Sequence, residues 1–196
     1  VYRKIDHGFV FVFDDKGTLN DRLDSDGNII WNNTADDETH MFLSFTDQDN
    51  KIFKPKLFNC IVEDKKGQLW LGTSSGPMIL TNPNNAFQDS FKCTRIKIAR
   101  NDGTDFADYL MAEDNVVTIA VDGANRKWLG TENNGLFLVS EDGQETIYHF
   151  TTENSFLPSN KINEVKINDK TGEIYIATSG GLAFFRSDAT EGTEDY

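Results

Sequence analysis

The sequence repeats one short frame three times, and this repeat constrains the fold more than any other feature. In each copy an acidic residue opens a turn, an aromatic residue follows six places later, and a threonine ends the frame after nine steps. The first two copies lie 58 residues apart and the next two 47, close to the roughly 40–50 residues of a β-propeller blade. The frame positions are Asp64, Gly67, Trp70 and Thr73; Asp122, Asn125, Trp128 and Thr131; and Asp169, Gly172, Tyr175 and Thr178.

Each position of the frame has a structural role that needs no ligand. Asp followed by Gly or Asn favours a tight turn, because the carboxylate accepts backbone N–H bonds and Gly or Asn tolerates positive φ. The aromatic residue begins the next strand and offers a large apolar surface between adjoining sheets. The small residue two places later, which is Gly72, Gly130 or Ala177, suits a position where a neighbouring sheet approaches the backbone. We therefore interpret the repeat positions as structural.

Composition narrows the classes of partner. The chain of 196 residues can build one domain with a substantial core, and its 38% hydrophobic content is typical of a globular protein. A net charge of −13 disfavours nucleic acid and anionic membrane surfaces as partners. No segment reaches the roughly 18 apolar residues of a membrane helix, so no direct membrane insertion is expected. Cys60 and Cys93 are interpreted as small apolar side chains, with a disulfide as the alternative.

The apolar runs predict an all-β chain of about four blades, each of four antiparallel strands. Strands are expected at 9–13 and 41–45, then at 58–62, 69–73 and 77–80, and further units follow at 116–150 and 162–185. The units span about 1–50, 51–100, 101–150 and 151–186, and the first, around Trp31 and Thr34, is degenerate. Residues 187–196 are expected to be a linker towards a missing C-terminal domain. We favour a partial arc of a larger, seven-bladed ring over a closed ring of four.

Two segments are less regular. In 91–100, Arg95 and Lys97 share one parity while Ile96 and Ile98 share the other, which predicts a half-buried outer strand. Residues 105–113 are the one place where a helical turn is expected.

No pattern for catalysis or metal binding is present in the sequence. It lacks nucleophile elbows, phosphate loops and dinucleotide fingerprints, so we predict no catalytic residue, no cofactor and no metal. Asp24, Asp26 and Asn28 alternate as calcium ligands can, but turn chemistry is favoured over calcium. The histidines are isolated in sequence and are interpreted as structural; they are His7, His40 and His149.

One concentration of positive charge stands out on this acidic chain. Lys92, Arg95, Lys97 and Arg100 lie within nine positions. The favoured interpretation is a solvated strand edge that discourages sheet-to-sheet aggregation. The alternative is a binding surface for an anionic glycan or an acidic partner.

The segments around the two tryptophans of the frame resemble a known family. Cys-Ile-Val-Glu-Asp at 60–64 precedes Trp70, and Leu-Gly-Thr follows it, as in the two-component regulator propeller repeats of Bacteroidetes. The unit centred on Trp128 is similar. A narrower likeness, to the PorZ-type propellers of the type IX secretion attachment complex, is carried by Asp-Tyr-Leu at 108–110 and by 121–131, 150–160, 172–178 and 185–192.

This resemblance implies an exported protein, in the periplasm or at the outer-membrane surface of a Gram-negative bacterium. It implies two seven-bladed propellers followed by a β-sandwich, and a non-catalytic role in recognising anionic lipopolysaccharide. Similar repeats also form the periplasmic sensors of hybrid two-component histidine kinases, which recognise polysaccharide fragments; this is the alternative. A propeller enzyme, either a lyase or a sialidase-like hydrolase, is the third possibility.

A partial ring should leave its two end blades uncovered. The apolar side chains expected there are Phe9, Phe11 and Phe13 at one end, and Leu182, Phe184 and Phe185 at the other. Such surfaces rarely stay bare on a soluble monomer. We expect them to contact other blades or domains of the native protein, or to drive self-association of this chain.

Overall fold

The computed structural model describes residues 8–16, 22–23, 25–30, 37–100, 103 and 106–186. This part of the chain consists of antiparallel strands and one 3₁₀ turn, η1 (Pro83–Asn85). The prediction of an all-β chain is confirmed.

Three sheets have the form of propeller blades, and their strands follow one another as simple hairpins. The first contains β7 (Phe58–Glu63), β8 (Leu69–Thr73) and β9 (Gly76–Leu80). The second contains β12 (Val116–Val121), β13 (Lys127–Thr131), β14 (Leu136–Val139) and β15 (Thr146–Phe150). The third contains β16 (Ile162–Asn168), β17 (Glu173–Thr178) and β18 (Gly181–Arg186).

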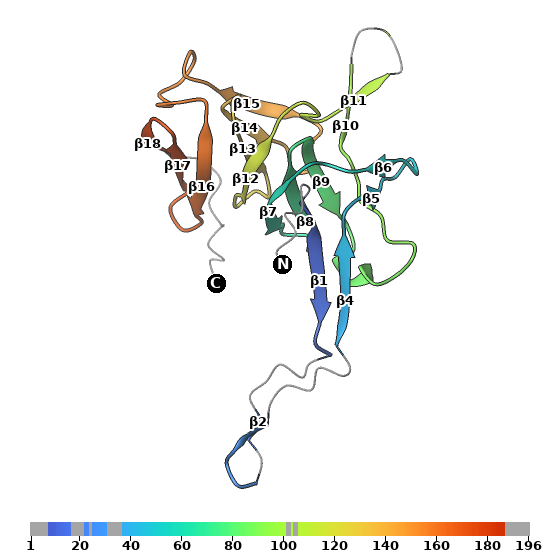
Figure 1. Ribbon diagram of the computed structural model, residues 1–196. Helices are drawn as coiled ribbons and strands as arrows, with labels where there is room; N and C mark the ends of the chain where they lie inside the picture. The colour runs from blue at the N-terminus through green and yellow to red at the C-terminus, as the bar shows by residue number, and fades with distance from the viewer. Residues whose placement is uncertain are drawn as a thin grey trace, which may run out of the picture.

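The three sheets lie side by side in an arc (Figure 1). Strand β12 packs between β7 and β16, so the first strands of the three blades are neighbours. The small residues of the frame make this approach possible. A Cβ on Gly130 would lie 2.5 Å from Thr118 Cγ2 and 2.6 Å from Ile162 Cγ2, and one on Gly72 would lie 2.7 Å from the Val116 carbonyl oxygen. The expectation of a sheet close to these backbones is confirmed.

The N-terminal part forms smaller paired elements. Strands β1 (Val10–Asp14) and β4 (Glu38–Phe42) make a ribbon that extends away from the blades (Figure 1). The short pairs are β2 (Arg22–Leu23) with β3 (Ile29–Ile30), and β5 (Phe45–Thr46) with β6 (Ile52–Phe53). The predicted degenerate frame around Trp31 and Thr34 lies outside the described residues, as do His7 and Asp24.

The predicted outer strand at 91–100 is wrong for most of its length. Only β10 (Lys97–Ala99) is a strand, and Thr94 makes a single bridge to Ile79. The Gln48 side chain explains the break, because it bonds the backbone N–H and carbonyl of Arg95 at 2.9 and 2.8 Å. Those two groups are therefore unavailable to a sheet partner.

The helical turn predicted at 105–113 is also wrong. This segment contains β11 (Ala107–Tyr109), which pairs with β10, and a turn that follows it. The Leu110 N–H donates to the Ile96 carbonyl at 2.8 Å, a partner distant in sequence rather than one within the same turn. A neighbouring segment thus decides the conformation, and no local propensity reveals it.

Candidate functional site

The frame aspartates are occupied by their own turns. Asp64 Oδ1 accepts the backbone N–H groups of Lys66 and Gln68 at 2.9 and 3.0 Å, and its Oδ2 accepts Trp70 Nε1–H at 3.2 Å. Asp122 bonds two N–H groups of its turn in the same way and accepts Trp128 Nε1–H at 3.3 Å. Each carboxylate therefore fixes both a turn and the tryptophan six places on.

The third copy of the frame departs from this pattern. Asn168, rather than Asp169, organises its turn: its side chain accepts the Lys170 N–H at 3.1 Å, and its carbonyl accepts the Gly172 N–H at 2.8 Å. The Tyr175 hydroxyl donates to Glu173 instead, at 2.9 Å. A turn one residue longer moves the anchoring position back by one place, which the fixed spacing from Asp169 to Thr178 concealed.

The frame threonines close the next hairpin of each blade. Their hydroxyls donate to the carbonyls of Gly76, Gly135 and Gly181 at 2.6, 2.8 and 2.8 Å. Gly76 and Gly135 have φ of 84° and 79°, in the region that favours glycine. The donors are Thr73, Thr131 and Thr178.

A buried ion pair joins the first blade to the second. Lys127 Nζ donates to Asp64 Oδ2 at 3.0 Å and to the carbonyls of Asn125 and Glu141 at 2.8 and 2.7 Å. The Trp70 ring lies 4.7 Å from the ammonium, and both charged side chains are fully buried. Sequence reasoning missed this pair, because an isolated lysine beside a strand tryptophan gives no sign of a partner 63 residues away.

The environment moves both pKa values of this pair downward. Burial lowers the pKa of Lys127, against the opposing effect of the Asp64 carboxylate. Burial alone would raise the pKa of Asp64, but the hydrogen bonds from Lys127, Gln68 and Lys66 outweigh it and lower that pKa. The hydrogen bond between Lys127 and Asp64 joins the two blades, while the remaining polar contacts of the pair lie within each blade.

The four predicted basic residues do not form one free surface. Lys97 Nζ lies 2.6 Å from Asp49 Oδ2, and Arg100 is held by both carboxylate oxygens of Asp108 at 2.6 and 2.8 Å. Lys92 Nζ donates to Asn50 Oδ1 at 2.7 Å.

The fourth basic residue is partly buried between two aromatic rings. The Arg95 guanidinium carbon lies 4.2 Å from the centre of the Phe53 ring and 3.7 Å from that of Tyr109. The Tyr109 hydroxyl in turn donates to Asp47 and Asp49 at 3.3 and 3.2 Å. Arg95 thus joins β6 to β11, and most of its cationic surface is covered.

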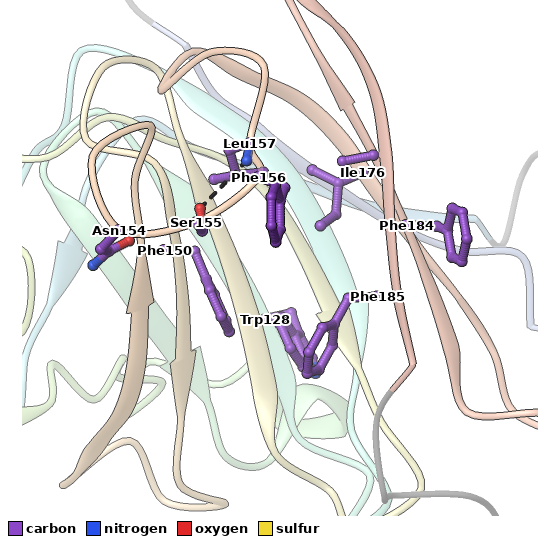
Figure 2. Close-up of a pocket in the computed structure, with 10 residues that line it drawn as sticks. Trp128, Phe150, Asn154, Ser155, Phe156, Leu157, Ile176, Phe184 and Phe185 are labelled. Atoms are coloured by element: carbon purple, nitrogen blue, oxygen red, sulfur yellow. Dashed lines mark hydrogen bonds between the residues drawn. The ribbon is translucent and has the colours of Figure 1, made fainter.

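An apolar cavity opens where the second and third sheets meet (Figure 2). It has a volume of about 260 Å³. Trp128 stacks on Phe150 with ring centres 5.9 Å apart and an angle of 7° between the planes, and Phe185 lies 5.9 Å from the same indole. Asn154 and Ser155 bring polar groups to the lining, and Phe156 is 100% exposed.

Register explains why this cavity exists. Leu129 pairs with Phe137 in the second sheet, and Ile176 pairs with Ala183 in the third, so Ala183 takes the place of Phe137. Phe137 stacks on His149 with ring centres 3.8 Å apart. In the third sheet the smaller Ala183 leaves space beside Ile176.

His149 itself lies 2.7 Å from the Asn134 carbonyl through Nε2, a structural contact.

The described residues contain no group of three or more acidic, histidine or cysteine side chains placed to hold a metal ion. Cys60 and Cys93 are free thiols, and burial raises their pKa values to about 11 and about 12. They are therefore apolar packing groups at neutral pH. Within the same residues there is no helix long and apolar enough to cross a membrane.

Comparison with known proteins identifies the repeat. Residues 53–75 match the family described as two component regulator propeller. These residues include Trp70 and its turn, so the resemblance predicted from the sequence is confirmed. Among curated proteins, none matches the chain.

Solved structures extend this likeness to nearly the whole chain. PorZ of Porphyromonas gingivalis, an essential bacterial surface component of the type-IX secretion system, is 26% identical, with a TM-score of 0.83. The match covers 98% of this chain and 24% of PorZ, so the chain spans about a quarter of that protein. The extracellular domain of a protein described as a hybrid two component system from B. thetaiotaomicron has a TM-score of 0.51 and 24% identity, over 85% of this chain and 21% of that one. At that identity it shows the propeller fold alone.

Proposed function

We propose that this chain is a non-catalytic recognition and scaffold segment of an exported surface protein that acts in type IX secretion. The observation that carries this proposal is the agreement with PorZ over 98% of the chain at a TM-score of 0.83. The use of the frame aspartates and threonines within turns and hairpins supports it, because few polar groups of the repeat remain for chemistry. The compartment in this proposal is the periplasm or the outer-membrane surface.

The ligand class that we propose is an anionic lipopolysaccharide, and Lys92, Lys97 and Arg100 are its candidate contacts. An anion there would displace Asp49 from Lys97 and Asp108 from Arg100. We therefore expect weak binding that decreases as salt increases.

Titration of the chain with purified lipopolysaccharide tests this ligand. Reversing the charge at Lys92 and Lys97 should weaken binding at least about tenfold, the equivalent of about 1.4 kcal/mol. Lys166→Glu is the matched control, because Lys166 is an exposed lysine of another sheet that also pairs with a carboxylate, Glu164. Equal affinity of lipopolysaccharide for the unmodified chain, the variant with both charges reversed and the Lys166→Glu control would contradict the proposed contacts.

A sensor of polysaccharide fragments is the second candidate, favoured by the family match at 53–75. The sequence that follows Tyr196 in the native gene distinguishes the two. A transmembrane helix with kinase modules would support the sensor, whereas a short β-sandwich would support the surface component.

The absence of catalysis stays a prediction. A screen of glycosidase, lyase and esterase substrates with the purified chain should show no turnover. Turnover that one point mutation abolishes would support the propeller-enzyme alternative instead.

A further inference from the structure

A second, more polar hollow lies on the second sheet, at the end where β14 begins and β15 ends. Its volume is about 200 Å³. The turn before β14, the paired strands β14 and β15, and the loop after β15 each contribute residues to its lining. These residues are Asn134, Phe137, His149, Thr151, Glu153 and Asn160. All of them precede β16, so the hollow is built by the second blade and the loop that follows it.

Two stacked rings form the aromatic part of the lining. Phe137 and His149 lie opposite each other on β14 and β15, and their planes differ by only 11°. Phe137 is half-buried against the cluster between the first two sheets, whereas His149 is exposed. The imidazole is therefore the outer layer of the stack. The repeat does not require this pair, because Met78 and Ala183 take the place of Phe137 in the other two sheets.

The polar part of the lining is held in place before any ligand binds. His149 Nε2 lies 2.7 Å from the Asn134 carbonyl, and Asn154 Nδ2 donates to the His149 carbonyl at 2.8 Å. The Thr152 N–H donates to Asn160 Oδ1 at 2.8 Å. These bonds tie the loop after β15 to the strand and to the preceding turn. A ligand would therefore have little loop ordering to offset on binding.

Several polar groups of this lining are still available for bonding. Within the described part of the chain, no group bonds the Glu153 carboxylate or accepts a bond from Asn160 Nδ2. The Thr151 hydroxyl accepts the Glu153 N–H at 3.3 Å and keeps its own proton to donate. The hollow thus offers a charged acceptor, an amide donor and a hydroxyl beside a flat ring.

We propose that this hollow binds one neutral pyranose residue of a glycan. The C–H face of the sugar lies on the His149 ring, whose π-face is electron-rich, and the sugar hydroxyls bond Glu153 and Asn160. The volume is below the roughly 300–1,000 Å³ of pockets for drug-sized ligands, which suits a single sugar residue. The described side chains of the lining include one carboxylate and no lysine or arginine, so an anionic sugar is disfavoured.

This site is separate from the basic residues to which we assign lipopolysaccharide. Lys92, Lys97 and Arg100 lie on the segment before the second sheet and would select a negative charge, whereas Glu153 disfavours one. The pyranose site requires neither an anionic ligand nor a role in secretion. Failure of either proposal would therefore leave the other unaffected.

Titration of the whole chain with simple sugars tests the site. The probes are the methyl glycosides of glucose, galactose, mannose and N-acetylglucosamine, each at millimolar concentration. We expect at least one of them to give saturable NMR shifts at the side-chain amides of Asn134 and Asn160 and at the backbone amides of 149–153. The methyl glycoside of glucuronic acid should bind more weakly than that of glucose, because its carboxylate is repelled by Glu153.

Substitution of Glu153 tests the polar contact. Glu153→Ala should weaken binding at least about fivefold, since a hydrogen bond to a charged group is lost. The fold should not change, because the carboxylate makes no contact with the described residues. Glu145→Ala is the matched control: Glu145 is another exposed carboxylate, in the turn before β15, and its removal should leave the affinity unchanged.

A pair of substitutions at His149 tests the stacking. His149→Phe and His149→Leu both lose the bond to the Asn134 carbonyl, but only the first keeps a flat ring. The phenylalanine variant should therefore bind the sugar at least about threefold more tightly than the leucine variant. Equal affinities of these two variants, or of Glu153→Ala and Glu145→Ala, would overturn the proposal. Shifts confined to other parts of the chain, no shift with any neutral glycoside, or tighter binding of the glucuronide would also overturn it.

Discussion

Equivalent positions of the second and third sheets lie in opposite environments. On the second sheet, Trp128, Leu136 and Leu138 are at most 2% exposed. The corresponding residues of the third sheet, Tyr175, Leu182 and Phe184, are 47%, 83% and 75% exposed. We call the outward surface formed by these three residues the end face. The spacing from the aromatic residue to the threonine is the same in both sheets. The third sheet covers these positions of the second sheet, and no described sheet covers those of the third.

The buried face is completed by its neighbour. Trp128 packs in one cluster with Ile162, Val165 and Ile174 of the third sheet, and Trp70 packs in the same way against the second sheet. A frame aromatic is therefore a core residue only where a following sheet covers it. The end face has the composition of an interface and the exposure of a surface.

The largest expected effect comes from removing the aromatic residue on each face. Trp128→Ala should reduce the free energy of unfolding by about 3–5 kcal/mol, because it leaves a large cavity in a packed core. Tyr175→Ala should change it by less than about 0.5 kcal/mol, as for other surface positions. Urea unfolding of the two variants measures both, and similar losses would show that the end face is covered.

The buried ion pair between the first and second blades gives a second comparison of a buried contact with an exposed one. Lys127→Ala should cost about 3–5 kcal/mol, because it leaves the Asp64 carboxylate buried without its cation. Lys166→Ala should cost no more than about 1 kcal/mol, since an exposed pair contributes little. A small effect at Lys127 would mean that the contact between the first two blades does not depend on this pair.

A smaller effect is expected from the glycine that lets β12, β13 and β16 approach. Gly130→Ala places a Cβ within 2.6 Å of two side-chain carbons, and overpacking of this kind costs about 1–3 kcal/mol. The third sheet has Ala177 at the equivalent position, so Ala177→Gly should have a smaller effect. Thermal unfolding of both variants tests the difference.

Acid should weaken the contact between the first and second blades. The folded pKa of Asp64 is lowered, so its contribution to stability is complete above the unfolded value of roughly 4 and is lost as the pH falls through the folded value. Lys127→Met should reduce this acid dependence, because the hydrogen bond from Lys127 is the largest of the lowering effects. Unfolding curves between neutral and acidic pH measure the slope, and an unchanged slope in the variant would contradict the assignment.

The repeat was sufficient to predict the blades but not what links them. Fixed spacing placed Trp70 and Trp128 on second strands between sheets, because turn chemistry and apolar runs are local properties. The pairing of Lys127 with Asp64 is set by the approach of two turns distant in sequence, so no local pattern indicates it. The predictions for 91–100 and 105–113 were wrong for the same reason, since Gln48 and Ile96 supply the partners of these segments from elsewhere.

The basic residues illustrate the limit for the site. Alternation predicted that Arg95 and Lys97 lie on the solvent face of one strand, but Arg95 lies outside β10, between two aromatic rings. It could not predict that Asp49 and Asp108 approach Lys97 and Arg100. The exposed ends were easier to anticipate: Phe11 and Phe13 at one end are 57% and 45% exposed. Phe11 lies opposite Met41 on the ribbon, which is 51% exposed, so this end also has an apolar outward face.

Light scattering over a range of micromolar concentrations tests most directly whether the two ends of the arc are open. If they are, the average mass should rise with concentration, and a charged substitution at Phe11 or Phe184 should return it to the monomer. Each of these side chains contributes roughly 1.5–3 kcal/mol when it becomes fully buried, so one charge should suffice. A monomer at every concentration, with solubility unchanged by either substitution, would contradict an open arc, because both ends would then already be covered within the chain.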